Sequence, residues 1–152
     1  MKTLQHDIIL LKLEEPLIFS KDVNKACLPT EDFDPSKSDS GCYVSGWGSL
    51  KKRLGPSSKL LHWVNMPLVP NSKCNLAYRG IITKNMICMG YPEGGKDSCR
   101  ADSGGPLVCP DEKRQAIITG VVSFGVGCGD PRYPGVYTKV VAYLKWIRRN
   151  ID

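Results

Sequence analysis

Seven cysteines in 152 residues constrain the fold of this chain more than any other feature of its sequence. Such a cysteine content is typical of proteins that fold in an oxidising compartment and are held together by disulfides. None of the cysteines is spaced Cys-x-x-Cys, which argues against a zinc ribbon or a thioredoxin-like redox site. The sequence leaves the pairing open. An odd cysteine in a secreted protein indicates a bond to another segment or chain.

Short runs of β-branched and aromatic residues, separated by turn residues, predict a mostly β domain. We expect strands over residues 41–50, 60–69, 81–89, 115–124 and 136–140. The apolar run at 7–13 is consistent with a further strand, buried on both faces. A helix is expected over 70–78, with Asn71 or Ser72 as N-cap, and another at the C-terminus, where apolar residues recur at helical spacing. Residues 14–40 are expected to form a connector, and 51–58 a basic turn.

The run from Asp97 to Pro106, Asp-Ser-Cys-Arg-Ala-Asp-Ser-Gly-Gly-Pro, contains the strongest candidate for chemistry. The glycines that follow Ser103 allow a sharp turn and a close approach of the backbone to a substrate. A hydroxyl on such a turn can be presented to a carbonyl group, whose developing negative charge is stabilised by neighbouring backbone N–H groups. The alternative for a serine in such a run is a polar surface turn.

This run resembles the active-site serine segment of the trypsin-like (chymotrypsin-fold) serine proteases. Further segments resemble that family in the same order along the chain: Asp7–Leu13, Gly46–Gly48, Val122–Gly125 and Pro134–Lys139. The resemblance begins partway into the family's domain, at its aspartate segment. It implies an all-β, chymotrypsin-like double β-barrel, with residues 1–40 as the end of the first barrel and connector, 41–139 as the second barrel and 140–152 as a C-terminal helix.

The resemblance implies a serine endopeptidase in which Ser103 is the nucleophile and Asp7 is the acid that orients a catalytic histidine. The family's triad runs His, Asp, Ser along the chain, but only six residues precede Asp7 here. We expect neither His6 nor His62 to act as the base, so the chain carries two of the three triad members. No cofactor and no metal are expected.

The resemblance also implies a specificity pocket with an acid at its floor. A carboxylate at the bottom of an apolar slot pairs with Lys or Arg, so the predicted partners are protein or peptide substrates cleaved after these residues. The residues carried over to this pocket are Asp97, Ser98, Ser123, Gly125 and Gly135.

Two further residues of the serine run receive roles from the resemblance. The carboxylate of Asp102 is expected to pair with the N-terminal amine that activation frees. The backbone N–H groups of Ala101 and Ser103 are expected to form the oxyanion hole. Ala101 stands where the family has glycine, and a non-glycine residue in the left-handed conformation costs about 1–2 kcal/mol. We therefore expect a weakened hole, and a protease-like binding module with impaired catalysis is the alternative function.

The cysteines can be paired by the same resemblance, which implies disulfides Cys42–Cys109, Cys74–Cys88 and Cys99–Cys128. Cys27 is then unpaired, and in many relatives the matching cysteine is bonded to an upstream chain. Secretion is inferred from the cysteines and the family, because no signal peptide is visible and no apolar stretch approaches transmembrane length.

The formal net charge of +6 includes two basic clusters, at residues 51–53 and 148–149. Such clusters are typical of solvated loops and helix ends, with binding of a heparin-like polyanion as the alternative. We expect no nucleic-acid partner.

Overall fold

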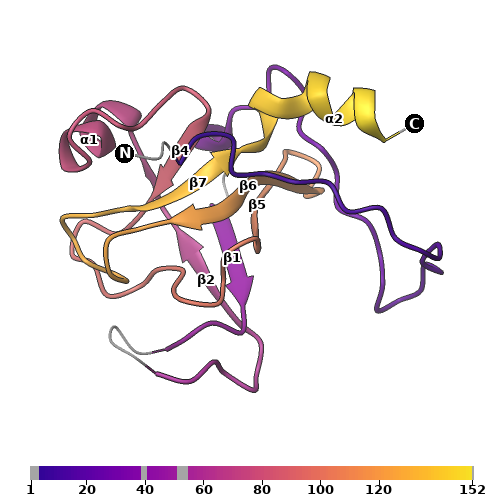
Figure 1. The fold of residues 1–152 in the computed structure, drawn as a ribbon, viewed down its shortest axis with the longest axis horizontal. Helices are drawn as coiled ribbons and strands as arrows, with labels where there is room; N and C mark the ends of the chain where they lie inside the picture. The colour runs from indigo at the N-terminus through magenta and orange to yellow at the C-terminus, as the bar shows by residue number, and fades with distance from the viewer. Residues whose placement is uncertain (1–3, 39–40, 51–54, 152) are drawn as a thin grey trace.

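The computed structural model describes residues 4–38, 41–50 and 55–151 of the chain. Seven strands form one antiparallel sheet in the order β2-β1-β5-β6-β7-β4-β3, which curls on itself in Figure 1. The strands are β1 (Cys42–Gly46), β2 (His62–Met66), β3 (Leu68–Val69), β4 (Met86–Met89), β5 (Pro106–Pro110), β6 (Ala116–Phe124) and β7 (Gly135–Lys139). The helices are η1 (Pro35–Lys37), α1 (Asn71–Ala77), η2 (Val140–Tyr143) and α2 (Leu144–Asn150). The expected all-β class with a C-terminal helix is confirmed, and the curled sheet fits a chymotrypsin-like fold with a partial barrel.

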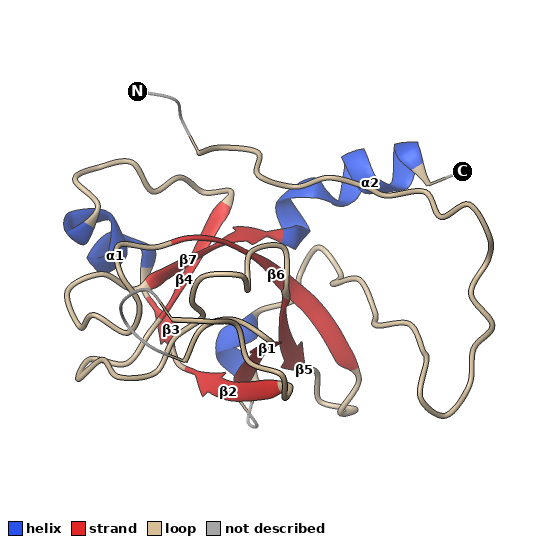
Figure 2. Cartoon of the chain, turned by 60° about the horizontal axis from the view of Figure 1, so that its bottom comes forward, coloured by secondary structure: helices blue, strands red, loops and turns tan. Residues whose placement is uncertain are grey.

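The apolar core lies within the curl of the sheet. One buried cluster joins β1, β2, β4, β5, β6 and β7, and its largest side chains include Met66, Leu107 and Tyr137. Alternate residues of β1 and β5 point into it, as the two-residue period of a strand requires. A further cluster joins η2 and α2 through Val140, Tyr143 and Ile147, and Ile8 of the N-terminal segment packs on it. The C-terminal helix and the N-terminal segment are therefore attached to the same corner of the sheet (Figure 2).

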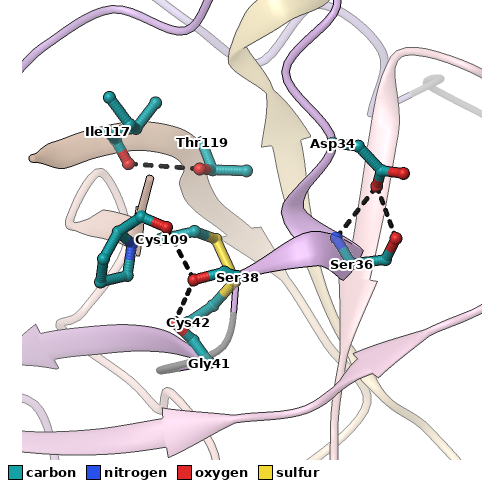
Figure 3. Close-up of a disulfide and its surroundings, with 9 residues drawn as sticks. Asp34, Ser36, Ser38, Gly41, Cys42, Cys109, Ile117 and Thr119 are labelled. Carbon is teal, nitrogen blue, oxygen red and sulfur yellow. Dashed lines mark hydrogen bonds between the residues drawn. A yellow bond between two sulfur atoms is a disulfide. The ribbon is translucent and has the colours of Figure 1, made fainter. Parts of the chain in front are cut away.

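Three disulfides hold the sheet and its loops together: Cys42–Cys109, Cys74–Cys88 and Cys99–Cys128. These are the pairs that the family resemblance implies, and Cys27 is free within the chain. The first disulfide links β1 to β5, and beside it the Ser38 hydroxyl donates to the carbonyl oxygens of Gly41 and Pro110 at 3.1 and 2.7 Å (Figure 3). The connector is thereby fixed to the edge of the core before the first strand begins.

The expected buried strand at residues 7–13 is wrong for this structure. The segment is extended but belongs to no strand, and Ile9 and Leu11 are 74% and 78% exposed. An apolar strand is buried on both faces only where neighbouring strands and a covering layer exist. Within the described residues, the segment is covered only at Ile8, which packs against the cluster of Val140, Tyr143 and Ile147.

Other differences are local. Strand β5 was not expected, because two prolines flank its short apolar run. Pro67 divides the expected strand at 60–69 into β2 and β3, and β4 is shorter than expected. The N-cap of α1 is Pro70, with no side-chain cap, because the Asn71 amide donates to the carbonyl oxygens of Thr83 and Met86. The expected basic turn at 51–58 lies partly outside the described residues.

Candidate active site

A cavity of about 300 Å³ opens among the loops that join β4 to β5 and β6 to β7. Two residues of the run from Asp97 to Pro106, Asp97 and Ser103, line the same cavity. The walls also include all of the other residues that the sequence assigned to a specificity pocket, namely Ser98, Ser123, Gly125 and Gly135. The Cys99–Cys128 disulfide ties the two loops together across the cavity. Residues from two distant parts of the sequence thus form one concave site.

The cavity is lined by one acidic residue, the half-buried Asp97, and by one basic residue, the exposed Arg100. The Asp97 Oδ2 accepts a hydrogen bond from the Gly129 N–H at 2.9 Å, while Oδ1 is buried without a hydrogen-bond partner in the described part of the chain. Burial is the largest cause that raises the pKa of Asp97 to about 6, although hydrogen bonds from the Gly129 and Ser98 backbones oppose it. A Cβ on Gly135 would stand 2.7 Å from Oδ1, so glycine leaves room for this carboxylate. An unpaired buried carboxylate in a cavity is suited to receive a cationic side chain.

The backbone around Ser103 is bent by residues in the left-handed region. The Asp102 N–H donates to the Cys99 carbonyl at 3.0 Å, which closes a β-turn with Ala101 as its third residue. Ala101 has φ 71° and Gly104 has φ 83°. A β-turn with positive φ at its third residue normally takes glycine there, so alanine is strained. Ser103 lies between these two residues with its side chain exposed, so its hydroxyl is accessible from the cavity.

The side chain of Asp102 lies on the other side of the serine turn. Its carboxylate accepts hydrogen bonds from the backbone N–H groups of Gly48 and Cys99 at 2.8 and 2.9 Å. A Cβ on either Gly46 or Gly48 would collide with this carboxylate, which explains the Gly-Trp-Gly sequence at the end of β1. Asp102 lines a second cavity, of about 240 Å³, together with Trp63 and other residues of β1 and β2.

Asp7 lies beside the first cavity although 96 residues separate it from Ser103 in the sequence. Its Oδ2 accepts a hydrogen bond from the Ser123 hydroxyl at 2.6 Å, and its main-chain oxygen accepts one from the Thr138 hydroxyl at 2.7 Å. Ser123 was expected in the pocket wall, but neither its hydrogen bond to Asp7 nor the hydrogen bond from Thr138 was predicted from the sequence. Pairing of β6 with β7 is what brings these two donors together.

The two histidines are engaged elsewhere. The His6 Nδ1 lies 3.1 Å from the Tyr143 hydroxyl, and the His62 Nε2 lies 3.0 Å from the Ser58 hydroxyl. Each imidazole is thus hydrogen-bonded to a side chain other than Ser103. Among the residues that the structure describes, no group of three or more His, Cys, Asp or Glu side chains could hold a metal ion. No helix in the same residues has the length and apolarity needed to cross a membrane.

Comparisons with known proteins place the chain beside one protein family. The family described as Trypsin matches residues 1–147. A protein named Trypsin from Xenopus laevis is 46% identical over 149 residues, which cover 98% of this chain and 58% of the Xenopus protein. Trypsin II-P29 of Gallus gallus is 44% identical over 149 residues, or 98% of this chain and 57% of the chicken protein. The chain therefore spans less than two thirds of the length of these relatives.

Proposed function

Because the chain belongs to the trypsin family, we propose that it is the C-terminal part of a serine endopeptidase that cleaves peptide bonds after Arg or Lys. The observation that carries this proposal is the cavity that contains both the exposed hydroxyl of Ser103 and the unpaired carboxylate of Asp97. A cationic substrate side chain that enters the cavity neutralises Asp97 and brings the following peptide bond to Ser103. The selectivity has a physical basis, because a buried carboxylate is stabilised most by a hydrogen-bonded partner of opposite charge.

Catalysis in this proposal needs a base from a segment outside residues 1–152, since both histidines of the chain are engaged elsewhere. That histidine removes the proton of Ser103 as its oxygen attacks the carbonyl carbon, and returns a proton to the leaving amine. Asp7, held by Ser123, orients the imidazole and stabilises its charged form. The backbone N–H groups of Ala101 and Ser103 stabilise the oxyanion, and water then hydrolyses the acyl-enzyme.

Asp102 has the environment of a regulatory carboxylate in this proposal. It lies next to a cavity of about 240 Å³, where an N-terminal amine freed by proteolytic activation would enter and pair with it. The protein is accordingly made as a zymogen, in an oxidising extracellular compartment that preserves its disulfides. Cys27, free here, bonds to an upstream chain.

The proposed function is tested with the full-length protein after proteolytic activation. An active enzyme gives a burst of product from an arginine ester, with one equivalent per active site, and cleaves peptides after Arg and Lys but not after Phe. Ser103→Ala removes the burst and is the control for contaminating proteases. The proposal fails if the activated protein gives no burst, or if its cleavage is indifferent to the charge of the residue before the cleaved bond.

A protease-like binding module is the second candidate, and the strained backbone of Ala101 favours it. Under this alternative the cavity binds a cationic side chain without cleaving the chain that carries it. Benzamidine, an apolar phenyl ring that carries a cationic amidinium group, is a suitable probe. Binding of benzamidine together with the absence of a burst, in a protein whose activation cleavage is complete, identifies the module.

A further inference from the structure

The residue that precedes the acid of the site is bound to the C-terminal part of the chain. His6 has φ 61°, in the left-handed region, where non-glycine residues are uncommon and where histidine is among the better tolerated. Its carbonyl oxygen accepts a hydrogen bond from the Ile8 N–H at 2.9 Å, which closes a three-residue turn with Asp7 at its centre. Asp7 is therefore presented at the apex of a tight turn rather than along a strand.

Strained backbone persists only where its surroundings hold it, and the surroundings of His6 are specific. The imidazole Nδ1 is 3.1 Å from the hydroxyl of Tyr143, and the two rings meet edge to face with centroids 5.9 Å apart. Tyr143 belongs to η2 and is only 8% exposed, packed with Val140 and Ile147. Because Tyr143 is packed in place, its contact restrains the His6 imidazole. This contact thereby restrains the turn of which His6 is the first residue.

Two contacts hold Asp7 directly, and a third holds the residue before it. The Ser123 hydroxyl of β6 holds its carboxylate, the buried Thr138 of β7 holds its carbonyl, and Tyr143 holds the residue before it. Residues 9–13, which follow it, are exposed and belong to no strand. On its N-terminal side, among the described residues, the contact with Tyr143 is the side-chain anchor of the turn.

We propose that His6 is a positioning residue, which acts through its contact with Tyr143 to keep the Asp7 carboxylate aimed at the catalytic base. The inference rests on the proposed function and concerns a residue without a role in it. Loss of the contact lets the turn relax from its left-handed conformation, and the carboxylate then shifts relative to the imidazole that it must orient. A misplacement of about 1 Å in such a constellation costs on the order of 10²-fold in rate.

Three variants separate the contact from the backbone strain. His6→Gly keeps the left-handed conformation accessible but removes the ring. Tyr143→Phe keeps the packing of η2 but removes the hydroxyl. His6→Asn tolerates positive φ and retains a polar group for Tyr143. Arg79→Gly is the matched control, because Arg79 is also a non-glycine residue at positive φ, 53°, but follows α1 and does not line the cavity that contains Asp97 and Ser103.

The measurements are the burst rate and steady-state kinetics of the activated full-length protein with an arginine ester, together with the affinity for benzamidine. We expect His6→Gly and Tyr143→Phe each to lower kcat by about 10- to 10²-fold, with unchanged benzamidine affinity, because the Asp97 cavity is not touched. The double variant loses no more than either single one, His6→Asn recovers most of the rate, and Arg79→Gly matches the wild type.

Two outcomes contradict the inference in different ways. If the wild type gives a burst and His6→Gly and Tyr143→Phe keep its kcat, the proposed function stands and the positioning role is wrong. If both variants lose benzamidine binding along with kcat, the contact only supports the fold, and the positioning role is again wrong. A wild type without a burst removes the proposed function, and this inference with it.

Discussion

At the scale of single residues, the site is defined by groups in costly environments. Asp97 is a carboxylate with one buried oxygen that has no hydrogen-bond partner among the described residues, and Ala101 has a backbone conformation that normally needs glycine. Each feature destabilises the folded chain. The buried carboxylate is what a site for a cationic group requires, whereas the strain at Ala101 comes from a side chain that the turn does not need.

Asp97 gives a pH dependence of stability with a definite sign. Its folded pKa of about 6 exceeds the reference value of 3.8, so the folded state binds more protons between these two values. The contribution of Asp97 to stability is therefore fully present below about pH 4 and is lost as the pH rises through about 6, by at most about 3 kcal/mol. Asp97→Asn should remove this loss.

The measurement is the difference in free energy of unfolding between Asp97→Asn and the wild type, by urea titration from pH 4 to pH 7. Taking this difference cancels the contributions of groups common to both proteins. One such group is Asp34, whose lowered pKa makes stability rise with pH. We expect the variant to gain relative stability as the pH rises. A difference that stays constant over this range would show that Asp97 is not desolvated in solution.

Ala101→Gly tests the strained turn. Glycine adopts positive φ without the cost of a Cβ, about 1–2 kcal/mol, although part of this gain is offset by its greater entropy in the unfolded chain. We expect a net stabilisation of up to about 1 kcal/mol in chemical denaturation, and a higher turnover in the activated full-length protein. A destabilised variant would argue that Ala101 is not held at positive φ.

At the scale of elements, loops that follow strand ends form the site, and the sheet sets their spacing. The Gly-Trp-Gly segment at the end of β1 approaches the carboxylate of Asp102 so closely that neither glycine can carry a side chain. This contact joins the β1 end to the serine turn, and the Cys99–Cys128 disulfide joins that turn to the loop after β6.

Gly48→Ala should therefore destabilise the protein by about 1–3 kcal/mol, as expected when a methyl group is forced into packed surroundings. Gly125→Ala is the control for stability, because the nearest atom to its added Cβ is 3.8 Å away, an ordinary contact. The midpoint of chemical denaturation distinguishes the two variants. Equal effects on both would mean that the loop after β1 yields to the new side chain.

At the scale of the whole molecule, the N-terminal segment has one packed side and one uncovered side. Ile8 packs against the cluster of Val140, Tyr143 and Ile147, whereas Ile9 and Leu11 lie largely in solvent. Contiguous exposed apolar residues mark surfaces that another segment covers or that promote association.

For the isolated chain of 152 residues, Leu11→Lys should reduce self-association without lowering the midpoint of unfolding, because a side chain that is 78% exposed contributes little to the fold. Ile8→Lys is the contrasting variant and should lower the midpoint, because it removes an apolar contact with the core. Analytical ultracentrifugation and thermal unfolding are the measurements. If Leu11→Lys associates as strongly as the wild type, the exposed face formed by Ile9 and Leu11 does not mediate self-association.

The family, the mostly β class and the residues that meet at the cavity could be predicted from the amino-acid sequence alone, because short motifs such as the run around Ser103 encode local geometry and chemistry. The folded structure was needed to show what those residues contact: the hydrogen bond from Ser123 to Asp7, the Asp97 oxygen without a partner among the described residues, and the contact between Tyr143 and His6. It was also needed to show that residues 9–13 are exposed. Their apolar pattern indicates only that they can be buried, whereas burial requires another segment to pack against them. Motifs are local in sequence, while partners are brought together by strand pairing and disulfides across long stretches of chain, and no local pattern records them.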